Sequence, residues 1–205
     1  MLPEYWNQAT QDLTTRDPVL KTLILTYTGL TLVSRGDAYS TLARSIVGQQ
    51  ISVKAAESVW KKLISYIQEP SPSTIASADS TSLRSCGLSG RKVEYLQELA
   101  RNFLNGEVNA ASWHEMEDEL LIRELVKIKG IGRWTAEMFM IFHFLRPNVL
   151  PLDDIGLQRA ISLHYKQGQP ISRLEIQELA KIWEPWRSVA TWYLWRSLDP
   201  VPVEY

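Results

Sequence analysis

Apolar residues recur every three or four positions along almost the whole chain, and this periodicity limits the fold more than any other feature. It is clearest after Gly48, where one helical face carries Val53, Ala56, Val59, Trp60, Leu63 and Ile67. Such spacing places one side of a helix in a core. A convincing strand-type alternation is missing, as is an internal repeat. The sequence therefore predicts an all-α protein of roughly nine or ten helices joined by short loops.

Several helix boundaries carry recognisable signals. Asp17 followed by Pro18 marks one N-terminus, and Ser52 marks another, because both patterns satisfy the first free amides of a helix. The loops at 69–73 and 145–154 are the best candidates for boundaries inside a two-lobed helical body.

The composition is that of an ordinary globular protein. Of the 205 residues, 45% are apolar and 22% are charged, and no apolar run is long enough to span a membrane. We expect no secretory leader, because no basic segment precedes an apolar one. The single cysteine, Cys86, excludes an internal disulfide framework and multi-cysteine zinc or iron–sulfur sites. A reducing compartment is expected, the cytoplasm of a bacterium or the nucleus of a eukaryote.

Two glycines, Gly130 and Gly132, stand between two helical patterns in the stretch KGIG. Glycine permits positive φ and a close approach of the backbone. A helix that begins at about Gly132–Arg133 would point its free N–H groups out of the turn, which is a site for a phosphate. Such a local site would bind DNA even though the formal net charge is −1, a value that alone argues weakly against nucleic acid. The alternative is a plain helix–helix corner.

Two carboxylates follow the second of these helices. That helix is expected to run for roughly 13 residues, about 20 Å, and the extended segment RPNVLPL can return over a similar length. Asp153 and Asp154 would then come back to the neighbourhood of the hairpin. A carboxylate beside a DNA phosphate is electrostatically unfavourable, so its presence there points to a function.

The segments LVKIKGIGRWTAEMFMIF and VLPLDDIGLQRAI together resemble the helix–hairpin–helix DNA glycosylases, the HhH-GPD superfamily. The interval from Gly132 to the second Asp agrees with that family, since 154 − 132 = 22 residues. YSTLARSIVGQQIS resembles the family's DNA-penetrating loop, SGRKVEYL resembles a recurrent segment, and WEPWRSVATWYLW resembles the active-site helix of the alkylpurine branch, 3-methyladenine DNA glycosylase II. The resemblance spans about residues 39–197.

The resemblance implies a two-lobed helical fold with the active-site cleft between the lobes. One lobe would comprise 1–40 plus 148–205, and the other 41–147, with the helix–hairpin–helix at about 121–145. Asp154 matches the family's catalytic aspartate, which stabilises an oxocarbenium-like transition state. The alternative is that Asp154 only caps the helix that follows, and both can be true. Asp153 is expected to face solvent or to cap.

Aromatic residues match the positions of the family's base pocket. Trp134 and Trp195 would stack on an electron-poor alkylated purine, and Met138 would line the same wall. The alternative is ordinary core packing, since the chain contains eight tryptophans. Trp134 also stands where relatives that cleave the DNA backbone carry a nucleophilic lysine, two residues after the last hairpin glycine, so no Schiff base can form there.

DNA contacts are implied at two further segments. The hairpin residues Lys129, Gly130, Ile131, Gly132 and Arg133 would hold a phosphate. The intercalating loop comprises Gln49, Gln50, Ile51 and Ser52; Gln50 matches the wedge position, although Gln49 or Ile51 could fill it, and a solvated helix kink is the alternative. A structural Na⁺ or K⁺ could bind the backbone carbonyls of Val126, Ile128 and Gly130.

The resemblance thus implies a monofunctional DNA glycosylase, acting as a monomer without a required cofactor. It would flip alkylated purines, chiefly 3-methyladenine and 7-methylguanine, out of damaged double-stranded DNA and hydrolyse the N-glycosidic bond. Three alternatives remain: a glycosylase of the same fold for other damaged bases, a catalytically silent DNA-binding module, and a helical protein-interaction domain.

Overall fold

The computed structural model describes residues 3–34 and 36–198, and over these residues it is entirely helical, with no strand. The all-α prediction is confirmed. Twelve α-helices and two short 3-10 helices occur in this part of the chain, more than the nine or ten expected. Helix α1 (Trp6–Arg16) was not predicted, because only Trp6, Ala9 and Leu13 of its residues are buried and the rest are mostly polar.

The chain packs into two compact units, one formed by residues 3–34 and 140–198 and the other by residues 36–139. None of the helices in the described part of the chain is long and apolar enough to cross a membrane. The two units are described separately below.

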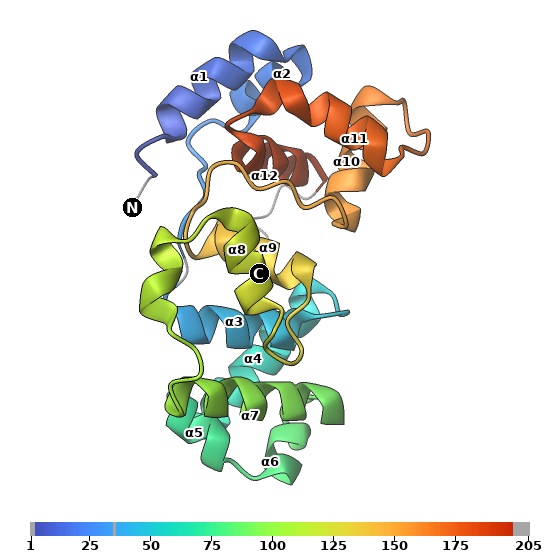
Figure 1. Cartoon of the computed structure of the whole chain (residues 1–205). Helices are drawn as coiled ribbons and strands as arrows, with labels where there is room; N and C mark the ends of the chain where they lie inside the picture. The colour runs from blue at the N-terminus through green and yellow to red at the C-terminus, as the bar shows by residue number, and fades with distance from the viewer. Residues whose placement is uncertain (1–2, 35, 199–205) are drawn as a thin grey trace. The chain divides into compact units, whose positions relative to one another are not determined.

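Unit 1 (3–34 and 140–198) is organised around α12 (Arg187–Leu198). Every residue of α12 from Ser188 to Arg196 is buried, so this stretch of the helix has no solvent-exposed face. It packs against α1, α2 (Pro18–Thr26) and α10 (Ile155–Tyr165), as Figure 1 shows. The remaining elements of the unit are α11 (Arg173–Leu179) and η2 (Ala180–Trp183).

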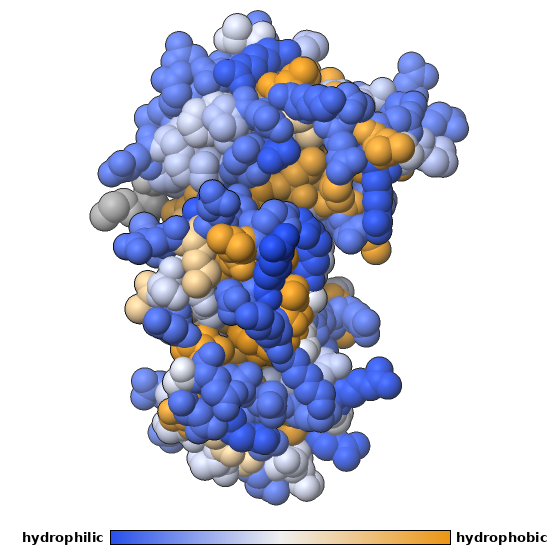
Figure 2. All heavy atoms as spheres, in the orientation of Figure 1, coloured by the Kyte–Doolittle hydropathy of each residue, from blue (hydrophilic) through white to orange (hydrophobic). Residues whose placement is uncertain are grey.

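Unit 2 (36–139) is organised around α7 (Gly90–Leu104), which packs against three other helices of the unit (Figure 1). These are α3 (Ala38–Gly48), α5 (Pro72–Ser77) and α6 (Ser80–Ser85). The other elements are α4 (Val53–Ile67), η1 (Ala110–Glu115), α8 (Asp118–Leu125) and the first part of α9 (Arg133–Phe142). Hydrophilic side chains cover most of the visible face over α5, α6 and α7 (Figure 2), while Leu96 and Leu99 of α7 are fully buried.

Helix α9 begins where the sequence predicts but ends earlier. Its first bond runs from the Ala136 amide to the Gly132 carbonyl, 3.0 Å, and its ten residues end at Phe142 rather than after roughly 13. The chain turns there, because Leu145 has a φ of +54° and the Arg146 amide bonds back to the Met140 carbonyl at 3.0 Å. The segment that leads to Asp154 is also broken by turns at 147–148 and 152–153, so it is less extended than expected.

Candidate functional site

Asp154 is the N-cap of α10 and is nearly buried, with 6% of its surface exposed. Its Oδ1 accepts a hydrogen bond from the Leu157 amide at 2.6 Å and a second from the Trp195 indole Nε1 at 2.7 Å. The capping role is therefore confirmed. A carboxylate in so little water is stabilised by charge-assisted bonds from donors of this kind, and both bonds fix its orientation.

Trp195 reaches Asp154 from α12, the central helix of unit 1. Its indole is 6% exposed and stacks on the Phe142 ring, with centroids 5.8 Å apart and planes inclined by 13°. The sequence predicted Trp195 only as a wall of a base pocket, and that contact stays a prediction. The structure adds a positioning role toward Asp154 that no local sequence signal indicates.

Gly156, two residues after Asp154, leaves room for this pair. A Cβ atom at Gly156 would lie 3.1 Å from Asp154 Oδ1 and 3.2 Å from Trp195 Cδ1. Neither neighbour can retreat easily, because Asp154 is held by two bonds and Trp195 by its stacking on Phe142. Sequence reasoning passed over this glycine, since it stands inside a helix and gives no turn signal.

The first residues of α12 hold the segment that precedes Asp154. Ser188, fully buried, accepts a hydrogen bond from the Val149 amide at 2.9 Å and donates its own amide to the Pro147 carbonyl at 2.9 Å. Arg187 donates Nε to Oδ1 of Asn148 at 2.9 Å. One helix therefore fixes both the approach to Asp154 and, through Trp195, its carboxylate.

The neighbouring carboxylate, Asp153, is in a different environment. It is exposed and forms an ion pair with Arg173 at the start of α11. The expectation that Asp153 faces solvent is confirmed. Of the two adjacent aspartates, only Asp154 is buried and held by an indole.

The hairpin of unit 2 needs its first glycine. Gly130 has a φ of +91°, and a Cβ atom there would lie 2.4 Å from the ring of Tyr95 on α7. Gly132 has no positive φ and nothing within 4 Å of a Cβ position. Ile131, between them, is buried. The conformational freedom expected of both glycines is used only by Gly130.

The two cationic side chains of the hairpin are paired with carboxylates. Lys129 Nζ lies 2.5 Å from Glu94 on α7, while Arg133 pairs with Glu119 on α8 and lies 3.0 Å from Glu137. The hydrogen bond to Glu94 raises the pKa of Lys129, and Arg133 lowers the pKa of Glu119. The glutamates offset the positive charges of Lys129 and Arg133, which is consistent with a chain that has no net positive charge.

The predicted intercalating loop lies between α3 and α4. Gln50 is exposed and has a φ of +59°, and Ile51 is 41% exposed. Ser52 caps α4 through a bond from the Ala55 amide at 3.3 Å, as predicted. Gln49 differs from these three residues: its amide nitrogen donates to the Gly130 carbonyl at 2.9 Å and to Thr135 Oγ1 at 3.2 Å.

The other two predicted pocket residues lie on the unit 2 part of α9. Trp134 is half-buried, and Met138, one turn later, is 3% exposed. Their contact with a base stays a prediction. Asp154 and Trp195 are brought together in unit 1, and Gln49, Gly130 and Thr135 in unit 2.

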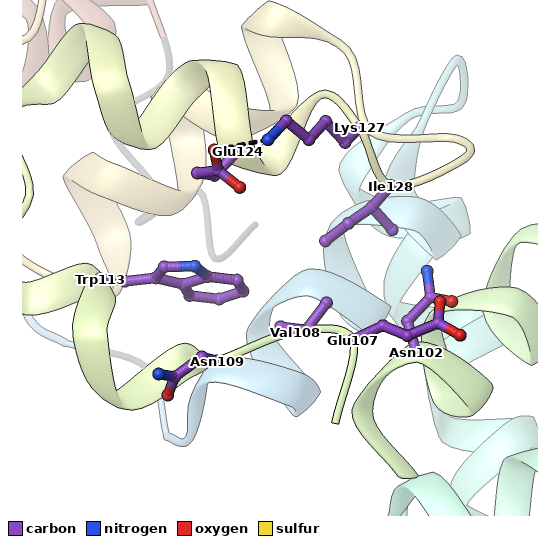
Figure 3. Close-up of a pocket in the computed structure, with 8 residues that line it drawn as sticks. All are labelled: Asn102, Glu107, Val108, Asn109, Trp113, Glu124, Lys127 and Ile128. Carbon is purple, nitrogen blue, oxygen red and sulfur yellow. Dashed lines mark hydrogen bonds and ion pairs between the residues drawn. The ribbon is translucent and has the colours of Figure 1, made fainter. Parts of the chain in front are cut away.

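Unit 2 also contains a cavity of about 140 Å³ beside the hairpin. It is lined by Asn102, Glu107, Val108, Asn109, Trp113, Glu124, Lys127 and Ile128 (Figure 3). An ion pair of 2.6 Å joins Glu124 to Lys127 at its edge. The cavity is smaller than typical ligand pockets of about 300 Å³ or more, and Ile128 is its only lining residue among the predicted site residues.

Comparison with known proteins identifies the family to which this chain is similar. Residues 43–185 match the HhH-GPD superfamily of base excision DNA repair proteins. DNA-3-methyladenine glycosylase 1 of Schizosaccharomyces pombe is 31% identical over 169 residues, which cover 80% of this chain and 74% of the relative. A DNA-3-methyladenine glycosylase of Bacillus subtilis is 30% identical over 194 residues, 89% of this chain but 64% of the relative, so the chain spans slightly less than two thirds of its length.

A solved structure agrees with the fold. The 3-methyladenine DNA glycosylase of S. pombe, in complex with abasic DNA, superimposes with a TM-score of 0.85 at 28% sequence identity. The superposition covers 97% of this chain and 99% of the other.

Proposed function

Because the chain belongs to the HhH-GPD superfamily of base excision DNA repair proteins, we propose that it is a DNA glycosylase. It hydrolyses the N-glycosidic bond of alkylated purines, chiefly 3-methyladenine and 7-methylguanine, in double-stranded DNA. The observation that carries this proposal is the buried Asp154 carboxylate, whose Oδ1 accepts bonds from the Leu157 amide and the Trp195 indole.

The geometry suits a carboxylate that stabilises positive charge. The bond between C1′ and the purine nitrogen breaks, and its electron pair leaves with the base, which departs neutral because alkylation had made it cationic. Positive charge develops on the sugar as an oxocarbenium ion, and the Asp154 carboxylate stabilises it electrostatically. Water then adds to C1′ and loses a proton, so that the products are an abasic site and a free base.

The substrate class follows from the chemistry of the leaving group. An alkylated purine is already a good leaving group, so the enzyme needs less discrimination than one that excises a neutral base. The base has to leave the stack before Asp154 can act on its sugar, which requires base flipping. Two relatives named DNA-3-methyladenine glycosylases support this class.

We further propose that the enzyme does not cleave the DNA backbone. Such lyase activity needs an amine that forms a Schiff base with the sugar, and Trp134 stands at the position of that lysine. Lys129, the nearest hairpin lysine, precedes the last glycine and is paired with Glu94. Strands should therefore break only after alkali treatment.

DNA binding is proposed to rest on the backbone of the hairpin. The first amides of α9 and the dipole of this ten-residue helix attract a phosphate, while Lys129 and Arg133 are held by Glu94 and Glu119. No cofactor is required in this proposal, and the protein acts as a monomer.

A monovalent cation at the hairpin remains part of the proposal. The Ile128 carbonyl accepts the Ile131 amide at 3.0 Å, and the Gly130 carbonyl accepts Gln49 Nε2. Each carbonyl oxygen has a second lone pair, so these two carbonyls, with that of Val126, fit a weakly bound Na⁺ or K⁺. Such an ion would offset negative charge next to a DNA phosphate.

The experiment that tests the proposed function compares the wild type with Asp154→Asn on methylated duplex DNA. Asparagine keeps an Oδ1 that can accept both the Leu157 and the Trp195 donors, so the fold should be retained, but the negative charge is lost. Base release under single-turnover conditions should fall by at least about 10²-fold, with binding to abasic-site DNA preserved. Parallel gels with and without alkali test the absence of lyase activity.

Three results would point elsewhere. Release of deaminated or oxidised bases but not of methylpurines, on a panel of lesions, would favour another glycosylase of the same fold. A wild type that binds abasic DNA but releases no base would favour a silent DNA-binding module. A protein with no salt-sensitive DNA binding would favour a protein-interaction domain.

A further inference from the structure

The side chain of Gln49, the first residue of the intercalating loop (Gln49–Ser52), forms hydrogen bonds to the hairpin. Its amide nitrogen carries two hydrogens, and both find acceptors: the Gly130 carbonyl at 2.9 Å and Thr135 Oγ1 at 3.2 Å. Gly130 and Thr135 lie on the two sides of the helix start at Gly132–Arg133. One side chain therefore spans the turn that is proposed to hold a DNA phosphate.

The orientation of this amide is determined by its partner. A backbone carbonyl only accepts hydrogen bonds, so the group that faces the Gly130 oxygen has to be the NH₂ group of Gln49 and not its oxygen. Thr135 is 3% exposed, and the ring of Tyr95 packs directly against Gly130. The bonds thus reach a part of the hairpin that is itself held by α7.

The rest of the loop is exposed to solvent. Gln50, Ile51 and Ser52 are all exposed, and Gln50 adopts a left-handed conformation that is rare for a residue with a side chain. The start of the loop is held a second time, because Lys92 of α7 donates Nζ to the Val47 carbonyl at 2.8 Å. The loop is therefore held by hydrogen bonds at its first residue, and the residues that follow are exposed.

We propose that Gln49 is a positioning residue for base flipping, which sets the loop in register with the phosphate-binding hairpin. Gln49 is then not the wedge, and the side chains that enter the duplex are those of Gln50 or Ile51. This inference rests on the proposed function, because register between the two segments matters only if a nucleotide is extruded. The hairpin holds the phosphate, and Gln49 transmits that position to the loop that fills the vacated space.

The test replaces Gln49 with leucine, which removes both donor hydrogens and shortens the side chain by one atom. Gln177→Leu is the matched control, the same change at an exposed glutamine of α11. Three quantities are measured for each: affinity for a duplex with a tetrahydrofuran abasic analogue, fluorescence of 2-aminopurine next to that site, and single-turnover base release from methylated DNA. The fluorescence rises when the neighbouring base loses its stacking.

Gln49→Leu should retain affinity for the abasic-site duplex within about threefold, since the hairpin amides are intact. Its fluorescence rise should be largely lost, and base release should slow by about tenfold, the size expected for two hydrogen bonds of ordinary strength. Thr135→Val removes one of the two acceptors, so its effect should be smaller than that of Gln49→Leu and not additive with it. Gln177→Leu should keep the affinity, the fluorescence rise and the rate of the wild type, because Gln177 belongs to neither the loop nor the hairpin.

Two outcomes would overturn the inference. In the first, Gln49→Leu gives the fluorescence and rate of the wild type. In the second, it lowers affinity and rate by the same factor, which would indicate damage to the hairpin itself. Both differ from failure of the proposed function, in which the wild type releases no base at all.

Discussion

Two buried aspartates in unit 1 look alike in the sequence and differ in the structure. Asp17 caps α2 and Asp154 caps α10, and each accepts a hydrogen bond from a tryptophan indole, Trp183 at 2.8 Å for Asp17 and Trp195 at 2.7 Å for Asp154. At Asp17 the donors divide between both oxygens: two helix amides reach Oδ1, while the hydroxyl of Tyr165 and the Trp183 indole reach Oδ2. At Asp154 the helix amide and the indole converge on Oδ1.

This difference decides how well asparagine can replace each aspartate, because asparagine has one accepting oxygen and one NH₂ group. Four neutral donors bond to the carboxylate of Asp17, which joins α2 to Tyr165 and to Trp183. Burial and the bond to Asp17 raise the pKa of Tyr165, so its hydroxyl stays a donor at neutral pH. An N-cap and an indole bond are therefore insufficient to identify a catalytic aspartate, since Asp17 has both.

The largest expected effect is on stability, at Asp17→Asn. The asparagine oxygen can keep the helix amides, but its NH₂ group then faces the Trp183 indole, which can only donate and is fully buried. One buried donor loses its acceptor, and the free energy of unfolding should fall by about 2–3 kcal/mol. Urea denaturation measures this change. Asp154→Asn should lower the free energy of unfolding by less than about 1 kcal/mol. An equal loss for the two variants would contradict the expectation that asparagine replaces Asp154 better than Asp17.

The next effect is on catalysis, at Trp195→Phe. Phenylalanine keeps a ring beside Phe142 but removes the N–H that orients Asp154. A hydrogen bond to a carboxylate contributes about 1.5–3 kcal/mol, so base release should slow by about tenfold or more. Single-turnover rates on methylated DNA provide the measurement. Trp183→Phe is the matched control, which should lower stability and leave the rate per folded enzyme unchanged.

The smallest effect should be at Gly156→Ala, and it should be larger on activity than on stability. Gly156→Ala adds a methyl group within 3.1 Å of Asp154 Oδ1 and 3.2 Å of Trp195 Cδ1, so the pair has to shift by a few tenths of an ångström. Base release should slow on the order of threefold, because catalysis is sensitive to small displacements. Alanine in a helix is favoured over glycine by about 0.5–1 kcal/mol, which offsets part of the cost of this shift, so the melting temperature should change little. A variant that is as active as the wild type would show that the pair has more room.

Much of the candidate site was predictable because its signals are local. The caps at Asp17, Ser52 and Asp154 each act on an amide two or three residues later, so the sequence shows both partners. The start of α9 after the hairpin is similarly local. The sequence did not predict every helix. It missed the polar helix α1 and did not separate the short helices α5 and α6, because few apolar positions mark them.

The chain's sequence by itself determined the all-helical class, the glycine turn before α9 and the cap at Asp154. The choice of Asp154 as the catalytic carboxylate came from the family resemblance and stays a prediction. Only the tertiary structure decided which side chains act on these elements. Trp195 is 41 positions from Asp154, and Gln49 is 81 positions from Gly130. Helical periodicity and capping depend on neighbours within a turn, whereas a hydrogen bond across such intervals exists only after the helices have packed. For that reason Trp195 was predicted as a pocket wall and Gln49 as one of three possible wedges, and their bonds to Asp154 and to the hairpin came from the packing alone.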